Sequence, residues 1–167
     1  KELQGKVKAC VVDTLNADEE RKTPSEKVAQ EMLRDVLLSE ELNGKGVIVS
    51  TFSSHLARLK EIETVGRKMG REVVFLGRSL DKYMKAGQTA KVTKFDSQIV
   101  GYSRRIRSRL KQIEKEGKEK FLIVATGHQG EPGSILDRIA RKDLKFQLKP
   151  EDAIVFSCRV IPAPQNI

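Results

Sequence analysis

The sequence predicts an α/β fold of three layers, in which helices cover both faces of a mostly parallel sheet. Several runs, such as "GVIVST" and "KFLIVAT", are almost wholly apolar, which is typical of strands buried on both faces. Segments that are apolar along one side follow these runs, which is typical of helices packed on such a sheet. With 167 residues and no linker-like stretch, the chain is expected to form a single domain over residues 1–167.

The first strand is expected at 6–13, "KVKACVVD", a short run rich in β-branched residues. A helix should follow, with Thr23 as N-cap, Pro24 at the first helical position and Glu26 completing a capping box. These two elements form the first strand–helix unit. The apolar stripe of this helix consists of Val28, Met32, Leu33, Val36 and Leu37.

The middle of the chain continues the alternation. Strands are expected at 46–51 and 72–77, and a helix at 54–69 lies between them. The second strand leads to a short helix near "SLDKYMKA", residues 79–86. Residues 87–95 are polar and have no clear periodicity, so we expect a loop there.

A long basic helix is expected next, at 97–116. Strands at 120–126 and 153–158 then flank a helix at 134–142. In a parallel sheet, the loops that leave the carboxyl ends of the strands share one edge, and α/β proteins bind ligands there. The inward positions of the basic helix are Ile99, Ile106, Leu110 and Ile113.

Composition restricts the partners. The chain has 32 basic and 23 acidic side chains, a net charge of +9, which favours a polyanion. Aromatic residues make up 5% and Trp is absent, so a surface built mainly on base stacking is disfavoured. No apolar run approaches the roughly 20 residues of a membrane helix, and a cytoplasmic location is expected. Cys10 and Cys158 lie in strand-like runs and are expected to be reduced, buried thiols.

Two loops of the predicted edge carry groups suited to an anion. In "STFSSH", Ser53 and Ser54 stand at a helix start, where they can bind an anion or simply cap the helix. In "GRS", Arg78 occupies a similar junction and can pair with a phosphate or remain solvated. The arginines and lysines of 97–116 form either a solvated helix face or a track for phosphates.

The loop "TGHQGEPGS" has more glycine and polar residues than a turn needs. Its glycines allow a close approach of the backbone to a ligand, and Gln129 and Glu131 can bond hydroxyls or base edges. His128 either contacts the ligand or braces the loop. The loop is neither a P-loop nor GxGxxG, and no His or Cys cluster predicts a metal site. Asp13, which ends the first predicted strand, is either catalytic or a cap of the following loop.

The residues alone therefore indicate a basic α/β domain whose edge is suited to phosphate or nucleotides. No nucleophile–base pair and no pair of catalytic carboxylates is evident. Two other functions stay open, a small-nucleotide-binding Rossmann-like module and a structural or dimerising domain. The first would bind a mononucleotide regardless of RNA length, and the second would show no salt-dependent affinity for RNA.

Five segments, taken in order, resemble ribonuclease J, and most closely its archaeal form. They are "VVDTLNADEERKTPSE", "VSTFSSHLARLKEI", "VVFLGRSL", "TGHQGEP" and "FSCRVIP". Ribonuclease J proteins combine a zinc-dependent metallo-β-lactamase domain with an inserted β-CASP domain, and they digest RNA from its 5′ end, some also cutting internally. The resemblance implies that this chain is the Rossmann-like β-CASP part, a fragment of a longer protein.

The resemblance also assigns roles to residues. The zinc motif HxHxDH is absent from the chain, so two zinc ions and all their ligands are expected outside it, and the chain alone should be inactive. Asp13 matches an acidic residue that supports the active site without binding zinc. The expected partners are single-stranded RNA, the metallo-β-lactamase domain of the same protein and a second copy of the chain, with no membrane. The residues expected to hold RNA are Ser53, Ser54, His55, Arg78, Ser79, Gly127, His128, Gln129, Gly130 and Glu131.

Overall fold

The computed structural model describes residues 5–12, 20 and 24–159, and these include one five-stranded, all-parallel sheet. The strand order is β3-β2-β4-β1-β5. Because the strands are numbered along the chain, this order shows that the chain runs outward from β1 to β3 and then back across to β5. The strands are β1 (Val47–Ser50), β2 (Glu72–Leu76), β3 (Gln98–Val100), β4 (Phe121–Ala125) and β5 (Ala153–Phe156).

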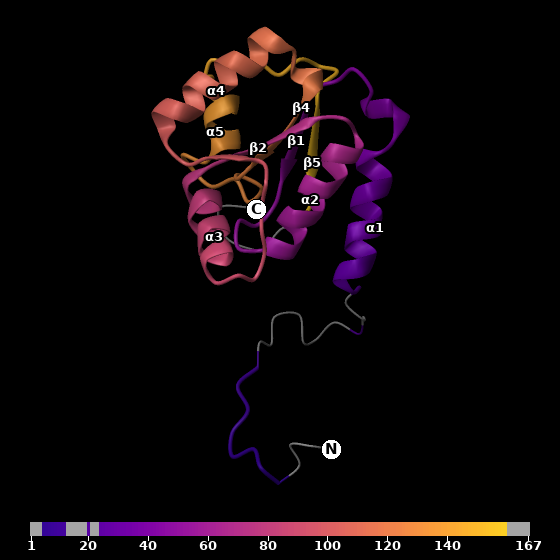
Figure 1. Cartoon of the computed structure of the whole chain (residues 1–167), viewed down its shortest axis with the longest axis vertical. Coiled ribbons are helices and arrows are strands. Elements are labelled where there is room, and N and C mark those ends of the chain that lie inside the picture. Colours follow the sequence, from indigo (N-terminus) through magenta and orange to yellow (C-terminus); the bar gives the residue numbers. More distant parts are fainter. Residues whose placement is uncertain (1–4, 13–19, 21–23, 160–167) are drawn as a thin grey trace.

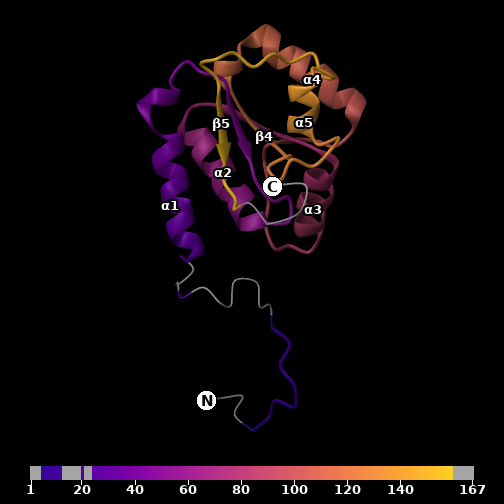
Figure 2. The same cartoon turned by 180° about the vertical axis from the view of Figure 1, so that it is seen from behind.

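Helices cover both faces of this sheet. They are α1 (Glu26–Leu37), α2 (Leu56–Lys68), α3 (Arg78–Thr89), α4 (Ser103–Glu116) and α5 (Ile135–Ala140), with short 3-10 turns η1 (Glu40–Leu42) and η2 (Lys118–Lys120). Residues of α1, α2 and α3 share one apolar core, and those of α4 and α5 share another. Figures 1 and 2 show the two groups of helices from opposite sides. The predicted three-layer α/β class is confirmed.

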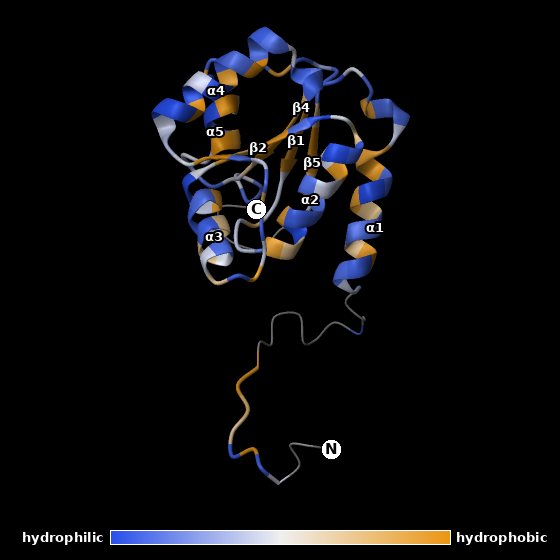
Figure 3. Cartoon of the chain, in the orientation of Figure 1, coloured by the Kyte–Doolittle hydropathy of each residue, from blue (hydrophilic) through white to orange (hydrophobic). Residues whose placement is uncertain are grey.

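The central strands β1, β2 and β4 are almost wholly apolar because each contributes to both cores, whereas β5 packs on one core only. Val47 and Val49 pack against the helices of one face, while Ile48 between them packs against those of the other. All four residues of β1 and all five of β4 are buried. In Figure 3 the strands are accordingly coloured as hydrophobic, and the outward sides of the helices as hydrophilic.

The carboxyl ends of all five strands lie in one row across the sheet. Ser50 of β1 is level with Ala125 of β4 and with Phe156 of β5. Leu76 of β2 is level with the same Ala125 and with Val100 of β3. Every loop that leaves a strand therefore starts from the same line, which is the edge predicted to hold the site.

The strand predicted at 6–13 is wrong over its described part. Residues 5–12 form no strand and pair with none of the described strands, and Val11 is 99% exposed. Composition favours a strand here, but a strand forms only where a neighbour completes its hydrogen bonds. The two cysteines are free, as predicted, but Cys10 is exposed and Cys158 only half-buried.

Helix α1 begins later than predicted. Its N-cap is Ser25, whose hydroxyl accepts a hydrogen bond from the Val28 N–H at 3.5 Å. Thr23, the predicted cap, lies outside the described residues. The predicted capping box is wrong as well, because with Ser25 as N-cap Glu26 is the first and not the third helical residue, and its carboxylate accepts hydrogen bonds from Arg58 of α2.

The predicted apolar stripe of α1 is only partly buried. Leu33 and Leu37 lie in the core, whereas Val28, Met32 and Val36 are 42%, 63% and 48% exposed. In Figure 1, α1 lies at the outer side of α2, near the β5 end of the sheet. The spacing of apolar residues thus predicts which side of a helix is apolar, but not how much of that side has neighbours.

The helix predicted at 97–116 is wrong at its start, where Gln98–Val100 form strand β3. Three residues are too few to show a strand periodicity, and their apolar members also fit a helical pattern. Helix α3 extends to Thr89, beyond the predicted 79–86, and so shortens the expected loop at 87–95. The other predicted elements after β1 are confirmed, with ends shifted by at most two residues.

Every helix in the described part of the chain is too short or too polar to cross a lipid bilayer.

Candidate functional site

A pocket of about 230 Å³ opens where the loops after β2, β3 and β4 meet. The first of these loops contains the predicted Arg78 and Ser79, and the last is the "TGHQGEPGS" loop. The structure therefore brings two predicted site residues together with the far end of the glycine-rich loop. We call this hollow the junction pocket, and its lining includes Gly77, Arg78, Ser79, Ser103, Ser134 and Arg138.

Two long helices begin at the junction pocket without a side-chain cap. The N-cap of α3 is Gly77 and that of α4 is Tyr102, and neither provides a side-chain hydrogen bond. By contrast, side chains cap the other α-helices, α1, α2 and α5, at Ser25, His55 and Ser134. The first backbone N–H groups of α3 and α4 remain donors and carry the partial positive charge of the helix start. Two such N-termini at one pocket are suited to an anion.

Two arginines add full positive charge to the junction pocket. Arg78 is exposed at the start of α3, and Arg138 is half-buried on α5. Neither forms an ion pair with a described residue, whereas the neighbouring Arg141 pairs with Asp137 at 2.8 Å. None of the described residues that line the pocket is acidic. The arrangement can therefore bind a phosphate through guanidinium groups and backbone N–H groups together.

Glycines set the path of the loop between β4 and α5. Gly127 has φ +127°, and a Cβ at this position would lie 2.6 Å from Ser134 Oγ and 2.7 Å from Leu136 Cβ. Gly130 also has a positive φ, +71°. A residue with a side chain would be strained at either position, so both glycines are needed for the backbone geometry.

The polar residues of this loop contact the protein itself. Glu131 Oε2 accepts a hydrogen bond from the Gln129 N–H at 3.0 Å, and Gln129 Nε2 donates to the Arg159 carbonyl at 2.9 Å. The His128 ring is buried, with its centroid 4.3 Å from that of Phe52. Neither ring nitrogen has a hydrogen-bond partner among the described residues, and burial lowers the pKa of His128. In the structure, these side chains brace the loop.

Ser53, Ser54 and His55 do not line the junction pocket. They follow β1, which flanks β4 on the side opposite to β2. The N-capping alternative for the serines is wrong, because His55 is the N-cap of α2 and its Nδ1 accepts a hydrogen bond from the Arg58 N–H at 3.2 Å. The hydroxyls of Ser53 and Ser54 form no hydrogen bond within the described part of the chain, and Ser54 is exposed. They are thus accessible for a ligand at the same edge.

Sequence reasoning missed Arg58, which joins three elements beside these serines. Its Nε and Nη2 donate to the Glu26 carboxylate, each at 2.7 Å, and these hydrogen bonds lower the pKa of Glu26. Its Nη1 donates to the Ser157 hydroxyl at 2.8 Å. Arg58 therefore holds α1, α2 and the end of β5 together. An arginine within a helix gives no sequence signal of which carboxylate it meets.

The described residues do not form a zinc centre. No group of three or more His, Cys, Asp and Glu side chains among them is arranged to hold a metal ion. Asp13, the candidate acidic residue, lies outside the described residues. The chemistry that the geometry supports is therefore the binding of an anion.

Comparison with known proteins places the chain in a family. The family model of the ribonuclease J beta-CASP domain matches residues 44–167. Ribonuclease J of Methanocaldococcus jannaschii is 43% identical over 158 residues, which are 93% of this chain and 35% of the relative. Ribonuclease J of Pyrococcus abyssi is 40% identical over 161 residues, 96% of this chain and 36% of the relative.

A bacterial relative extends the comparison. Ribonuclease J of Sinorhizobium meliloti is 31% identical over 163 residues, 96% of this chain and 27% of the relative. The chain thus spans about a third of the length of its archaeal relatives, and less of this bacterial one. The resemblance drawn from the five segments is confirmed. The chain belongs to the ribonuclease J family, and its residues 44–167 match the beta-CASP domain of that family.

Proposed function

We propose that this chain is the RNA-gripping part of a zinc-dependent ribonuclease, and that the junction pocket holds a phosphate of single-stranded RNA. The proposal is carried by two uncapped helix N-termini that meet two arginines without an acidic partner among the described residues. Phosphate matches this set of donors in both charge and number of acceptor oxygens. The relatives are named ribonuclease J, which makes RNA the natural source of that phosphate.

RNA that leaves the junction pocket along the carboxyl edge would pass the loop after β1. Ser53 and Ser54 there have hydroxyls without a partner among the described residues, so they can contact further backbone oxygens. The braced loop at 126–134 follows β4, the middle strand of the sheet, so it lies between the loop after β2, which carries Arg78, and the loop after β1, which carries the two serines. By this proposal, three loops form one binding edge.

The bond-breaking groups are proposed for the rest of the full-length protein. Two zinc ions bound there would supply an activated water for attack on a phosphodiester. This chain would contribute positioning, because a fixed phosphate holds the neighbouring phosphodiester in place for that attack. We propose that the full-length protein digests RNA from its 5′ end and also cuts internally, acts in the cytoplasm, and that the chain alone is inactive.

The test uses the full-length protein and RNA with either a 5′-monophosphate or a 5′-hydroxyl. Arg78→Ala and Arg138→Ala should each raise KM about 10-fold or more, because a hydrogen bond to a charged group contributes roughly 1.5–3 kcal/mol. Replacing Ser53 and Ser54 together by Ala should raise KM less, with kcat and zinc content little changed. Arg107→Ala, on the exposed face of α4, is the matched control.

Two results would decide against the proposal. If KM stays unchanged in both arginine variants while their melting is normal, the junction pocket does not hold the substrate. If a mononucleotide binds as tightly as longer RNA, the chain is better described as a small-nucleotide module. An increase in KM that is confined to 5′-monophosphorylated RNA would place the terminal phosphate in the pocket.

A further inference from the structure

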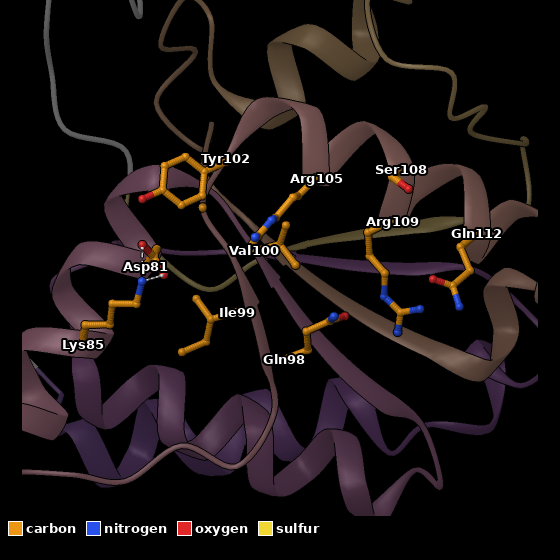
Figure 4. Close-up of a pocket in the computed structure, with 11 residues that line it drawn as sticks. Asp81, Lys85, Gln98, Ile99, Val100, Tyr102, Arg105, Ser108, Arg109 and Gln112 are labelled. Atoms are coloured by element: carbon orange, nitrogen blue, oxygen red, sulfur yellow. Dashed lines mark hydrogen bonds and ion pairs between the residues drawn. The ribbon is translucent and has the colours of Figure 1, made fainter.

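A second hollow, of about 320 Å³, lies between α3 and α4 along the free edge of β3 (Figure 4). It adjoins the junction pocket, because Gly101 lines both. Nothing in the proposed function requires this hollow, although two of its arginines belong to the basic helix that the sequence offers as a phosphate track. We call it the β3 groove, and its main polar residues are Lys85, Gln98, Tyr102, Arg105, Arg109 and Gln112.

The β3 groove is positively charged. Three basic side chains line it, and the single carboxylate among its lining residues is that of Asp81. This carboxylate pairs with Lys85 at 2.8 Å. Arg105 forms no ion pair with a described residue, and its guanidinium lies 6.0 Å from the centre of the Tyr102 ring. Arg105 is therefore free to bind an anion beside an aromatic ring.

Arg109 is a buried arginine in the wall of the groove, and its donors are not all used. The residue is 8% exposed, its Nη2 donates to Glu72, and its guanidinium lies 5.0 Å from the centre of the Phe121 ring. Its Nε is buried without a hydrogen-bond partner among the described residues. Buried donors normally have an acceptor, so Arg109 keeps donor capacity that its hydrogen bond to Glu72 does not use.

Tyr102 offers a stacking surface at the mouth of the groove. It is 63% exposed, so one face of its ring is open to a ligand. Figure 4 shows Tyr102 at one end of the groove and Gln98, Arg109 and Gln112 at the other. Amide side chains can donate to and accept from the edges of a base. The groove thus combines a ring, cations and amide groups.

We propose that the β3 groove binds a nucleotide of single-stranded RNA next to the phosphate held in the junction pocket. One base stacks on Tyr102, Arg105 binds the adjoining phosphate, and the amide groups of Gln98 and Gln112 at the far end of the groove contact the edge of a base. This assignment rests on the proposed function. A peptide added to the edge of β3 fits less well, because the strand offers only three residues for pairing.

The test measures binding of RNA to the full-length protein with oligonucleotides of roughly 4 and roughly 16 nucleotides. Tyr102→Ala should weaken binding of the longer RNA about 5- to 150-fold, which corresponds to the loss of one stacked base. The shorter RNA should be weakened by a similar factor, because the stacked nucleotide lies next to the junction pocket and is present in both lengths, whereas Tyr102→Phe should bind like the wild type. Arg105→Ala should weaken binding of the longer RNA and reduce its dependence on salt.

The chain offers matched controls. Tyr83 on α3 is the other tyrosine and lies outside the groove, so Tyr83→Ala should bind RNA normally, as should Arg107→Ala. Tyr102 provides no side-chain cap to α4, so its removal leaves the helix start intact. Unchanged binding of the longer RNA by Tyr102→Ala overturns the assignment, and so does a loss confined to the longer RNA, which would put the stacked base far from the junction pocket. If the wild type binds neither RNA, the proposed function itself fails.

Discussion

Gly127 stands where β4 turns into the glycine-rich loop, and both its φ and its surroundings exclude a side chain. We expect Gly127→Ala to lower the free energy of unfolding by about 1–3 kcal/mol, because a strained backbone and a crowded Cβ would act together. Urea unfolding of the full-length protein measures this. Gly133→Ala is the control, since its φ is +76° but no atom lies within 4 Å of the added Cβ. Equal stability of both variants would show that crowding at Gly127 is relieved by movement of the loop.

His128 should make the protein less stable in mild acid. Burial lowers its pKa in the folded state below the ordinary value of 6.5, so the unfolded chain binds a proton more readily. The stabilising effect of the neutral ring is complete above about pH 6.5 and decreases as the pH falls toward the folded-state pKa. We expect His128→Gln to show a smaller loss of unfolding free energy between about pH 8 and about pH 5 than the wild type. If His55→Gln, at an exposed histidine, changes the pH dependence more, the assignment to His128 is wrong.

At the level of single residues, the sequence predicts part of the candidate site. Arg78 and Ser79 are recognisable because they stand at a strand–helix junction. Arg138 cannot be recognised in the sequence as a site residue. It lies within α5, one turn after the Ser134 N-cap, and only this position brings it near the same edge of the sheet. The burial of His128 could not be predicted, because it depends on Phe52, a residue from a different loop.

Among the elements, β5 depends on one carboxylate at its start. Asp152 is 5% exposed, accepts from the Gly46 N–H and the Lys149 N–H at 2.9 Å each, and pairs with Lys118 at 2.7 Å. Burial alone would raise its pKa, but these hydrogen bonds outweigh burial and lower it. We expect Asp152→Ala to lower the free energy of unfolding by about 1–3 kcal/mol, because two N–H groups would lose their acceptor and Lys118 would keep only Glu114 and the Gln147 carbonyl as partners.

Calorimetric or urea unfolding checks this prediction. Asp96→Ala is the matched control, because the Asp96 side chain is 44% exposed and its ion pairs with Arg67 and Lys94 are at the surface. Such pairs contribute at most about 1 kcal/mol. If both aspartate variants lose the same small amount, Asp152 does not fix the start of β5.

The elements that could be predicted are those whose own residues show a pattern of apolar positions typical of a strand or a helix. Strands buried on both faces are almost wholly apolar, so β1, β2 and β4 are visible in the sequence, and β5 is visible as an apolar run although one of its faces is partly exposed. Strand β3 is not, because three residues beside a helix leave no distinct pattern. The run at 5–12 has the composition of a strand but lacks a partner among the described strands. Local pattern thus predicts where a strand can form, and pairing decides whether it does.

For the molecule as a whole, the net charge of +9 predicts that RNA binding depends on salt. The logarithm of the affinity should fall linearly with the logarithm of the salt concentration, with a slope of about −0.7 per phosphate contacted on a single strand. Arg78→Ala should make this slope less steep by about 0.7, whereas Arg107→Ala should leave it unchanged. Affinity that stays flat between low and physiological salt would contradict an electrostatic mode of binding.

The isolated chain should hold no stoichiometric zinc and should not cleave RNA. The reason is that the whole sequence has two histidines and two cysteines, which are too few to bind two zinc ions in the usual way. Metal analysis of the purified chain, with the full-length protein as control, measures this. About two tightly held zinc ions per chain would require ligands within it, and would overturn the division of labour proposed above.

The sequence predicts the layers of the molecule but not the order of the strands. Alternating strands and helices fix a parallel sheet, yet several orders satisfy that alternation. The observed order sets β2 and β3 on one side of β4 and β1 on the other. For this reason Arg78 and Arg138 meet at the junction pocket, while Ser53 and Ser54 do not.

Pairing of β1 with β5 also affects how the chain folds as it is made. The hydrogen bond from Gly46 N–H to Asp152 joins residues 106 apart, and β5 is the last of the described strands to leave the ribosome. At about 5–20 residues per second, translation leaves one edge of β1 without its partner for roughly 5–20 s. Over that time, the apolar Val47–Ser50 edge of the nascent chain can pair with any other unpaired strand nearby. Protection by a chaperone would therefore matter most between the synthesis of β4 and that of β5.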